Sequence, residues 1–302
     1  MPDLKAGDKI KVTQDDGGKV TMGRSSKGNH SRLTAVGDLQ PGEWTYVPEE
    51  KTFYLKVAGK LADARVEAPY RRNGVAFRCP KVAGSHVVIK DLIVCHVLND
   101  GWNLHGTTKD ILLKNIAAYE CGDDGISPHD TCEVSIDGYW AIGNSTGMAN
   151  GNLSVTKASN VRLEANTAHQ FMTGHAPVTE LSNAIIIATP GTQPVNVTNA
   201  QDTRWSIDNV QISGSTAQKV LNVVNSVIIA KRITCEGPGW ENAGSVEVTD
   251  SRIIGEVTNL PGGTWKGEKD GAGANPAEFK IPPRPVPHPA AGKFTTLKTE
   301  RQ

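Results

Sequence analysis

The chain has 302 residues, enough to bury a large core in one elongated domain or in two ordinary ones. Its 32 basic residues balance its 32 acidic residues, so no global field would draw it to nucleic acid or to a membrane surface. Glycine is plentiful, with 31 residues, and aromatic residues are few, which favours many short strands joined by tight turns over a helical bundle.

Residues 1–62 are predicted to form an irregular, β-structured N-terminal region. Strand-like segments at 8–13 and 19–22 flank Asp15-Asp16-Gly17-Gly18, a sequence typical of a hairpin turn. The segments WTYV and TFYLKV flank residues 48–51 in the same way. The sequence therefore predicts two β-hairpins in this region.

The first residues of the chain do not form a signal peptide, because they include no apolar segment. No apolar run is long enough to cross a membrane, so no transmembrane helix is predicted. We expect a secreted or periplasmic protein whose leader is absent from this sequence, and a cytoplasmic location stays open. The five cysteines include no CxxC pair and are interpreted as buried free thiols, with one disulfide as the alternative.

Residues 63–258 contain a repeat of strand-like segments. Equivalent apolar positions of successive segments recur at nearly equal spacings, at Val87, Ile111, Val134 and Val161. Each segment alternates apolar residues and is interrupted by a polar pair, as at Lys90-Asp91, Lys114-Asn115, Asp137-Gly138, Asp208-Asn209 and Asp250-Ser251. Strand, bend, strand and return loop make one coil of a parallel β-helix, and stacking of the coils supplies the core. A βαβ fold is disfavoured because no intervening segment has helical periodicity.

Regularly spaced glycines mark a further short strand in each coil. The residues that follow them are predicted to form an inward-facing ladder of Trp102, Ile126 and Met148. The next positions are predicted to face outward, namely Asn103, Ser127 and Ala149. Residues 259–302 lack the repeat and are rich in proline and glycine, so we expect an extended tail that lies along the β-helix or caps it.

One polar sequence occurs twice, one repeat apart. Asp124 follows Asp100 at the same spacing at which His129 follows His105. Equivalent residues of stacked coils are about 4.8 Å apart, so these side chains are expected to form a two-coil Asp/His stack beside Asp123. Two close carboxylates raise the pKa of one of them, which can then act as a general acid. The alternative is ordinary turn chemistry, since aspartate before glycine is common in turns.

Other candidates lie near this stack or two coils beyond it. Asp130 is expected either to orient an imidazole or to cap a turn, and Arg162 to face outward as a cation for a substrate carboxylate or as a solvated residue. Trp140 is a candidate sugar-stacking platform, with a core position as the alternative. No cofactor and no metal site are predicted. Calcium binding stays open, although the DxDxDG spacing of calcium loops is absent.

The repeat resembles the right-handed parallel β-helix proteins of the pectin-lyase-like superfamily, which includes polysaccharide lyases, uronan C5-epimerases, glycoside hydrolases and phage tailspikes. The sequence Gly125-Ile126-Ser127-Pro128-His129-Asp130 is similar to the DPHD motif of mannuronan C5-epimerases. That resemblance implies a catalytic role for His129. Ser127 stands where that family has aspartate, and Asp124 where some members have tyrosine.

A second resemblance concerns the acidic residues. Asn99-Asp100-Gly101 and Gly122-Asp123-Asp124 resemble the NTD and GDD motifs of polygalacturonase-type hydrolases, which implies catalytic aspartates at 100, 123 and 124. The Gly-His-Gly motif expected one coil later is replaced by Gly147-Met148-Ala149.

Three functions follow from these observations. The first is a carbohydrate-active enzyme that acts on a uronate-containing polysaccharide by β-elimination or C5 epimerisation, with His129 as base, Asp124 or Asp123 assisting and Arg162 neutralising the substrate. The second is a glycoside hydrolase that uses Asp100, Asp123 and Asp124. The third is a non-catalytic glycan-binding or structural β-helix. The expected partner is a polysaccharide, not nucleic acid or a membrane; the sugar and the oligomeric state stay open.

Overall fold

The computed structural model describes residues 36–39, 44–47, 52–55, 73–79, 86–174, 178–198, 203–214 and 219–286. The chain divides into one unit of residues 1–70 with 287–302 and a second unit, Arg71–Val286. In the first unit, η1 (Val36–Asp38) precedes the strands β1 (Trp44–Val47) and β2 (Thr52–Leu55). These strands pair antiparallel, which confirms the second predicted hairpin. The first predicted hairpin lies outside the described residues.

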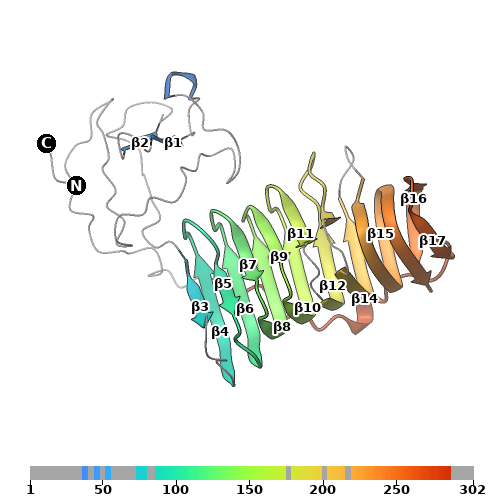
Figure 1. Ribbon diagram of the computed structural model, residues 1–302, viewed down its shortest axis with the longest axis horizontal. Coiled ribbons are helices and arrows are strands. Elements are labelled where there is room, and N and C mark those ends of the chain that lie inside the picture. Colours follow the sequence, from blue (N-terminus) through green and yellow to red (C-terminus); the bar gives the residue numbers. More distant parts are fainter. Residues whose placement is uncertain are drawn as a thin grey trace, which may run out of the picture. The chain divides into compact units, whose positions relative to one another are not determined.

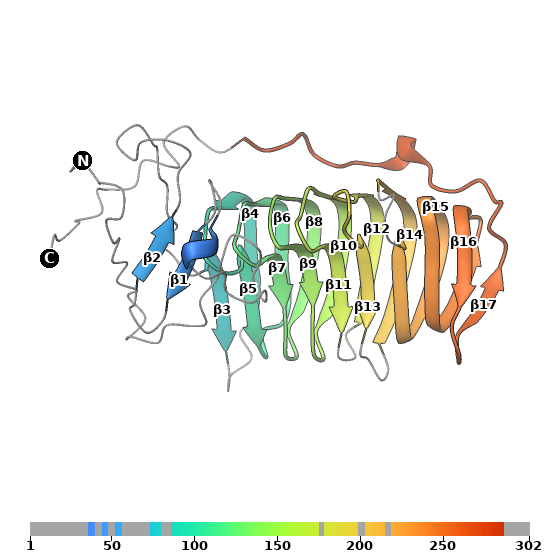
Figure 2. The same cartoon turned by 90° about the horizontal axis from the view of Figure 1, so that it is seen from above.

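The second unit is a parallel β-helix of about seven turns, which confirms the predicted all-β fold class. Short strands stack along one path, β3 (Val75–Cys79), β5 (Trp102–Gly106), β7 (Asp124–Pro128), β9 (Thr146–Asn150), β11 (His169–Gly174) and β13 (Val195–Thr198). Long strands stack along a second path, β4 (Val87–Cys95), β6 (Ile111–Tyr119), β8 (Glu133–Ile142), β10 (Val155–Glu164), β12 (Val178–Ile187) and β14 (Thr203–Ser213). Figures 1 and 2 show the coils side by side, ending in β15 (Leu221–Thr249), β16 (Arg252–Asn259) and β17 (Thr264–Gly267).

Each long strand bends once at a residue with positive φ. The bend residues of β4 to β14 have φ between 47° and 82° and are Asp91, Asn115, Gly138, Asn160, Asn183 and Asn209. Apart from glycine, asparagine and aspartate tolerate this left-handed conformation best. The polar pairs seen in the sequence are therefore the corners of the coils.

The predicted inward ladder is confirmed. Trp102 pairs in register with Ile126, and Ile126 with Met148, and all three side chains are fully buried. The ladder continues through Phe171, whose ring stacks on Trp205 with centroids 4.7 Å apart. The residues expected to face outward are also shielded from solvent, with exposed fractions of 1–4% at Asn103, Ser127 and Ala149.

After β17 the chain turns back along the β-helix, as Figure 2 shows, and we call residues 268–286 the strap. The strap contains the short helix η3 (Pro276–Glu278). Its backbone N–H groups donate to side chains of successively earlier coils, at Thr234 of β15, Asn209 of β14 and Asn160 of β10.

No helix in the described part of the chain has the length and apolar character needed to cross a membrane. Cys95, Cys121, Cys132 and Cys235 are free thiols.

Candidate functional site

Three aspartates converge where β5 and β7 begin. Asp100 precedes β5, and Asp123 and Asp124 occupy the same place one coil later. The Gly101 N–H donates to the Asp124 carbonyl at 2.9 Å, and the Asp124 N–H donates to Asp100 Oδ1 at 3.4 Å. One carboxylate oxygen from each aspartate lies within 4.8 Å of the other two. The backbone register thus gathers the three groups into one cluster, the carboxylate cluster.

The surroundings of Asp124 favour its protonated form. Desolvation raises the pKa of the Asp124 carboxyl well above its usual range, and the charges of Asp123 and Asp100 raise it further. Hydrogen bonds to the hydroxyls of Ser127 and Thr146 act in the opposite direction and offset part of this effect. The close approach of Asp100 and Asp123 and the burial of its carboxyl therefore make Asp124 harder to ionise than an ordinary aspartate.

Two stacked imidazoles lie at the other end of the same short strands. The rings of His105 and His129 are nearly parallel, at 14°, with centroids 4.8 Å apart. His129 follows the last residue of β7, five positions after Asp124, so at about 3.3 Å per residue their Cα atoms are up to about 16 Å apart. Between the two clusters, Asn103 donates a hydrogen bond to Asp100, and Ser127 contacts Asp124.

Asp130 both caps a turn and contacts a histidine. Its Oδ2 accepts the Gly106 N–H at 2.8 Å and lies 3.5 Å from His105 Nδ1. Its Oδ1 accepts a hydrogen bond from Asn152. The Gly106 hydrogen bond, followed by the charge of His105, lowers the pKa of the Asp130 carboxyl. The sequence left open which histidine Asp130 would orient, and the structure places it against His105.

Gly151 provides the space in which the His129 ring lies. A Cβ atom at residue 151 would be 2.5 Å from His129 Nδ1 and 2.7 Å from Cε1, closer than real contacts allow. The sequence shows glycine at the position that would extend the histidine stack, and the structure shows that a side chain there would displace the imidazole.

Comparison with known proteins adds no relative: no protein-family model, no curated protein and no solved structure matches the chain. The fold is therefore established by strand pairing alone. Because one fold can host unrelated activities, the function must be inferred from the chemistry of the site.

Arg162 and Trp140 belong to the long strands and contact each other. The Arg162 Cζ lies 5.2 Å from the centre of the Trp140 ring, and its Nε donates to Glu164 Oε2 at 2.7 Å. The Trp140 side chain is 9% exposed, and its indole N–H donates to the Pro282 carbonyl of the strap. Trp140 is thus covered by the strap and is not an open stacking platform, and Arg162 is paired with a carboxylate.

The sequence alone predicts no function for two polar residues beside the aspartates. It predicts only an outward orientation for Asn103 and Ser127, although these residues occupy equivalent places in successive repeats. In the structure Asn103 donates to Asp100, and the Ser127 hydroxyl contacts Asp124.

Among the residues that the structure describes, the carboxylate cluster is a group of acidic side chains close enough to hold a metal ion. Hard cations such as Ca²⁺ prefer carboxylate and amide oxygens, so Asp100, Asp123 and Asp124 have suitable chemistry. Calcium normally takes six to eight oxygen ligands, so water or backbone carbonyls would have to complete the set. The raised pKa of the Asp124 carboxyl reflects repulsion among the carboxylates, which a bound cation would also relieve.

Proposed function

We propose that the chain is a carbohydrate-active enzyme of the pectin-lyase-like superfamily that hydrolyses a polysaccharide at the carboxylate cluster. The observation that carries this proposal is the cluster of three aspartates, in which burial and the neighbouring carboxylates raise the pKa of Asp124. Hydrolysis of a glycosidic bond needs a carboxylic acid to protonate the leaving oxygen and a carboxylate to activate water or to attack. The cluster supplies both within one group of residues.

Each aspartate has a distinct role in this proposal. Asp124 gives its proton to the glycosidic oxygen as the bond to the anomeric carbon breaks. Asp123 attacks the anomeric carbon as that bond breaks, because carboxylates this close leave no room for a water between them. Water then attacks the same carbon, gives a proton back to Asp124 and releases Asp123, so that bonds and protons balance. Asp100 accepts the Asp124 N–H, and its charge helps to keep Asp124 protonated.

The test is product analysis on a panel of neutral and uronate-containing polysaccharides. Hydrolysis releases reducing ends without new near-ultraviolet absorbance. The Asp124→Asn variant should fold normally and lose activity by about 10²- to 10⁴-fold, the usual contribution of a general acid. Wild-type protein that binds a glycan of the panel but never cleaves it would instead indicate a non-catalytic glycan-binding β-helix.

The stacked imidazoles favour a second candidate, β-elimination or C5 epimerisation of a uronate. There His129 would remove the proton at C5, and a cation would neutralise the adjacent carboxylate. Arg162 is paired with Glu164, so this reaction would require that pair to open before Arg162 could neutralise the substrate. Elimination gives unsaturated ends that absorb in the near ultraviolet, and His129→Ala would abolish them.

A further inference from the structure

The strap ends on an outward-facing aromatic surface. Tyr119 of β6 and Trp140 of β8 form a small apolar cluster with Ala117, separate from the main core, and Ile281 of the strap packs against it. We call this cluster of Ala117, Tyr119 and Trp140 the aromatic surface. Tyr119 is 6% exposed and Trp140 9% exposed, although both lie on the outside of the coils.

The part of the strap over this surface, Phe279–Val286, has the sequence FKIPPRPV and contains no helix or strand. Trp140 Nε1 donates to the Pro282 carbonyl at 2.9 Å, and the Tyr119 hydroxyl donates to the Pro285 carbonyl at 2.8 Å. Polyproline II helices have three residues per turn, so carbonyls three positions apart face the same side. The two aromatic donors therefore match the period of a polyproline helix.

Side chains add to this match. The guanidinium of Arg284 lies 5.7 Å from the centre of the Tyr119 ring, within cation–π range. Gly138 is the one bend between β4 and β14 without a side chain, and a Cβ there would lie 3.0 Å from Pro282 Cγ. The bends of the neighbouring coils carry asparagine, at Asn115 and Asn160. The bend without a side chain thus lies where the strap needs room.

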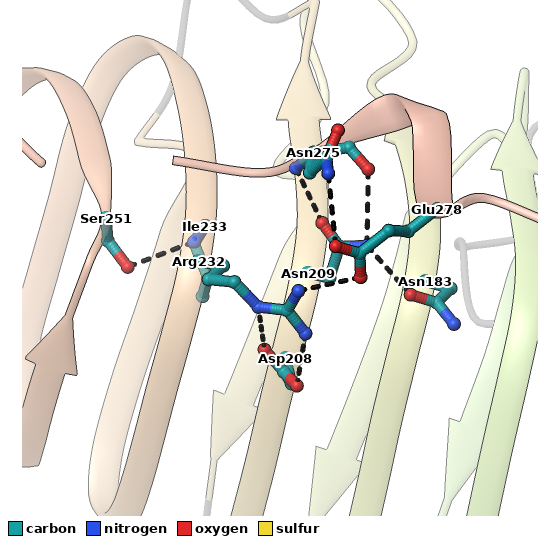
Figure 3. Close-up of polar contacts among 8 residues, drawn as sticks. All are labelled: Asn183, Asp208, Asn209, Arg232, Ile233, Ser251, Asn275 and Glu278. Atoms are coloured by element: carbon teal, nitrogen blue, oxygen red, sulfur yellow. Dashed lines mark hydrogen bonds and ion pairs between the residues drawn. The ribbon is translucent and has the colours of Figure 1, made fainter. Parts of the chain in front are cut away.

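The strap is held near this surface by contacts further along the chain. Figure 3 shows Arg232 of β15 between Asp208 and Glu278, with N···O distances of 2.7 Å to each carboxylate. Asn275 donates from its backbone to Asn209 at 2.7 Å. Such tethering raises the effective concentration of the proline segment at the aromatic surface. A free ligand of the same kind would therefore have to compete with the tethered segment.

We propose that the aromatic surface is a binding site for an extended proline-rich segment, and that Phe279–Val286 of this chain is its resident, detachable ligand. Aromatic surfaces that donate hydrogen bonds to proline-flanked carbonyls are a general way to bind polyproline helices. The segment joins no strand ladder over β6 and β8, so its release leaves the coils paired. This proposal is independent of the catalytic one.

The test uses a full-length variant, Ile281→Asp with Arg284→Glu, in which a charge in the apolar cluster and the loss of the cation–π contact release the strap. Limited proteolysis within 279–286 reports the release, and circular dichroism reports the fold. A labelled FKIPPRPV peptide, followed by fluorescence anisotropy, should bind this variant about tenfold or more tightly than the wild type, whose site is filled. A peptide with alanine in place of Pro282 and Pro285 should bind more weakly.

Gly138→Asn is the matched control. Asparagine suits the left-handed bend, as at the neighbouring coils, but its side chain occupies the space of Pro282. Added to the released variant, it should reduce peptide binding by about tenfold, and alone it should make the strap sensitive to protease. The proposal is overturned if the released variant stays folded without binding the peptide, if Gly138→Asn does not weaken binding, or if neither variant frees the strap.

Discussion

Replacing Gly151 with alanine tests whether the carboxylate cluster and the stacked histidines act independently. The new Cβ would lie 2.5 Å from His129 Nδ1, and an ordinary contact begins at 3.4 Å, so the ring must move by about 0.9 Å. Gly151 has no positive φ, so alanine is compatible with its backbone. The substitution therefore displaces the imidazole that follows the end of β7, whereas Asp124 is the first residue of that extended strand.

A displacement of about 1 Å can reduce a rate by about 100-fold when the displaced group takes part in the chemistry. We expect Gly151→Ala to keep its hydrolytic rate within about twofold of wild type, because the carboxylate cluster is untouched. Any elimination or epimerisation that depends on His129 should fall by about 100-fold. Reducing-end release and near-ultraviolet absorbance measure the two reactions in the same sample.

Gly37→Ala is the control for the chemical change, because no atom of the described residues lies within 4 Å of a Cβ at that position. Melting temperatures of both variants show whether the fold is retained. If Gly151→Ala lost hydrolysis as completely as Asp124→Asn while remaining folded, His129 would belong to the hydrolytic centre, and its separation from the carboxylates would be refuted.

Three further predictions concern the acidic cluster and the core. Because the pKa of Asp124 is raised in the folded protein, the free energy of unfolding should fall as pH rises from the ordinary carboxyl range near about 4 through that raised pKa. Urea unfolding at a series of pH values measures this loss, which Asp124→Asn should remove. Equal pH profiles of the two proteins would contradict the raised pKa. Hydrolysis should persist in EDTA, because Asp124 as the acid and a neighbouring carboxylate suffice for the reaction. Activity that is lost in EDTA and restored by Ca²⁺ would show that the cluster works through a cation. Phe171→Ala should reduce the free energy of unfolding by about 3–5 kcal/mol, because it leaves a cavity beside Trp205; a loss below about 1 kcal/mol would mean that the coils collapse around it.

The fold and the stacking of the candidate residues could be predicted because both depend on one short-range feature, the repeat spacing. Once two coils are aligned one repeat apart, parallel pairing brings Asp100 beside Asp124 and His105 beside His129. The ladder through Trp102 follows from the same alignment. Side-chain alternation could not reveal that Ser127 on the opposite face is shielded from solvent as well, because that depends on neighbours outside the strand.

The environment of Trp140 could not be predicted for a different reason. Its partner Pro282 is far away in sequence, in a tail without periodicity, so no local pattern links them. The sequence allowed the tail to lie along the coils. It could not show where the tail would pack, because that depends on the space left beside the bend at Gly138. The outward direction of Arg162 likewise follows from the sequence, but its pairing with Glu164 does not, because that pairing depends on the side-chain rotamers.

The protonation state of Asp124 is the central claim, and carboxyl ¹³C NMR of aspartate-labelled protein measures it directly. We expect one carboxyl to titrate well above the usual aspartate range and its signal to be absent from Asp124→Asn. A wild-type spectrum in which every aspartate titrates in the usual range would contradict the claim and remove the general acid from the site.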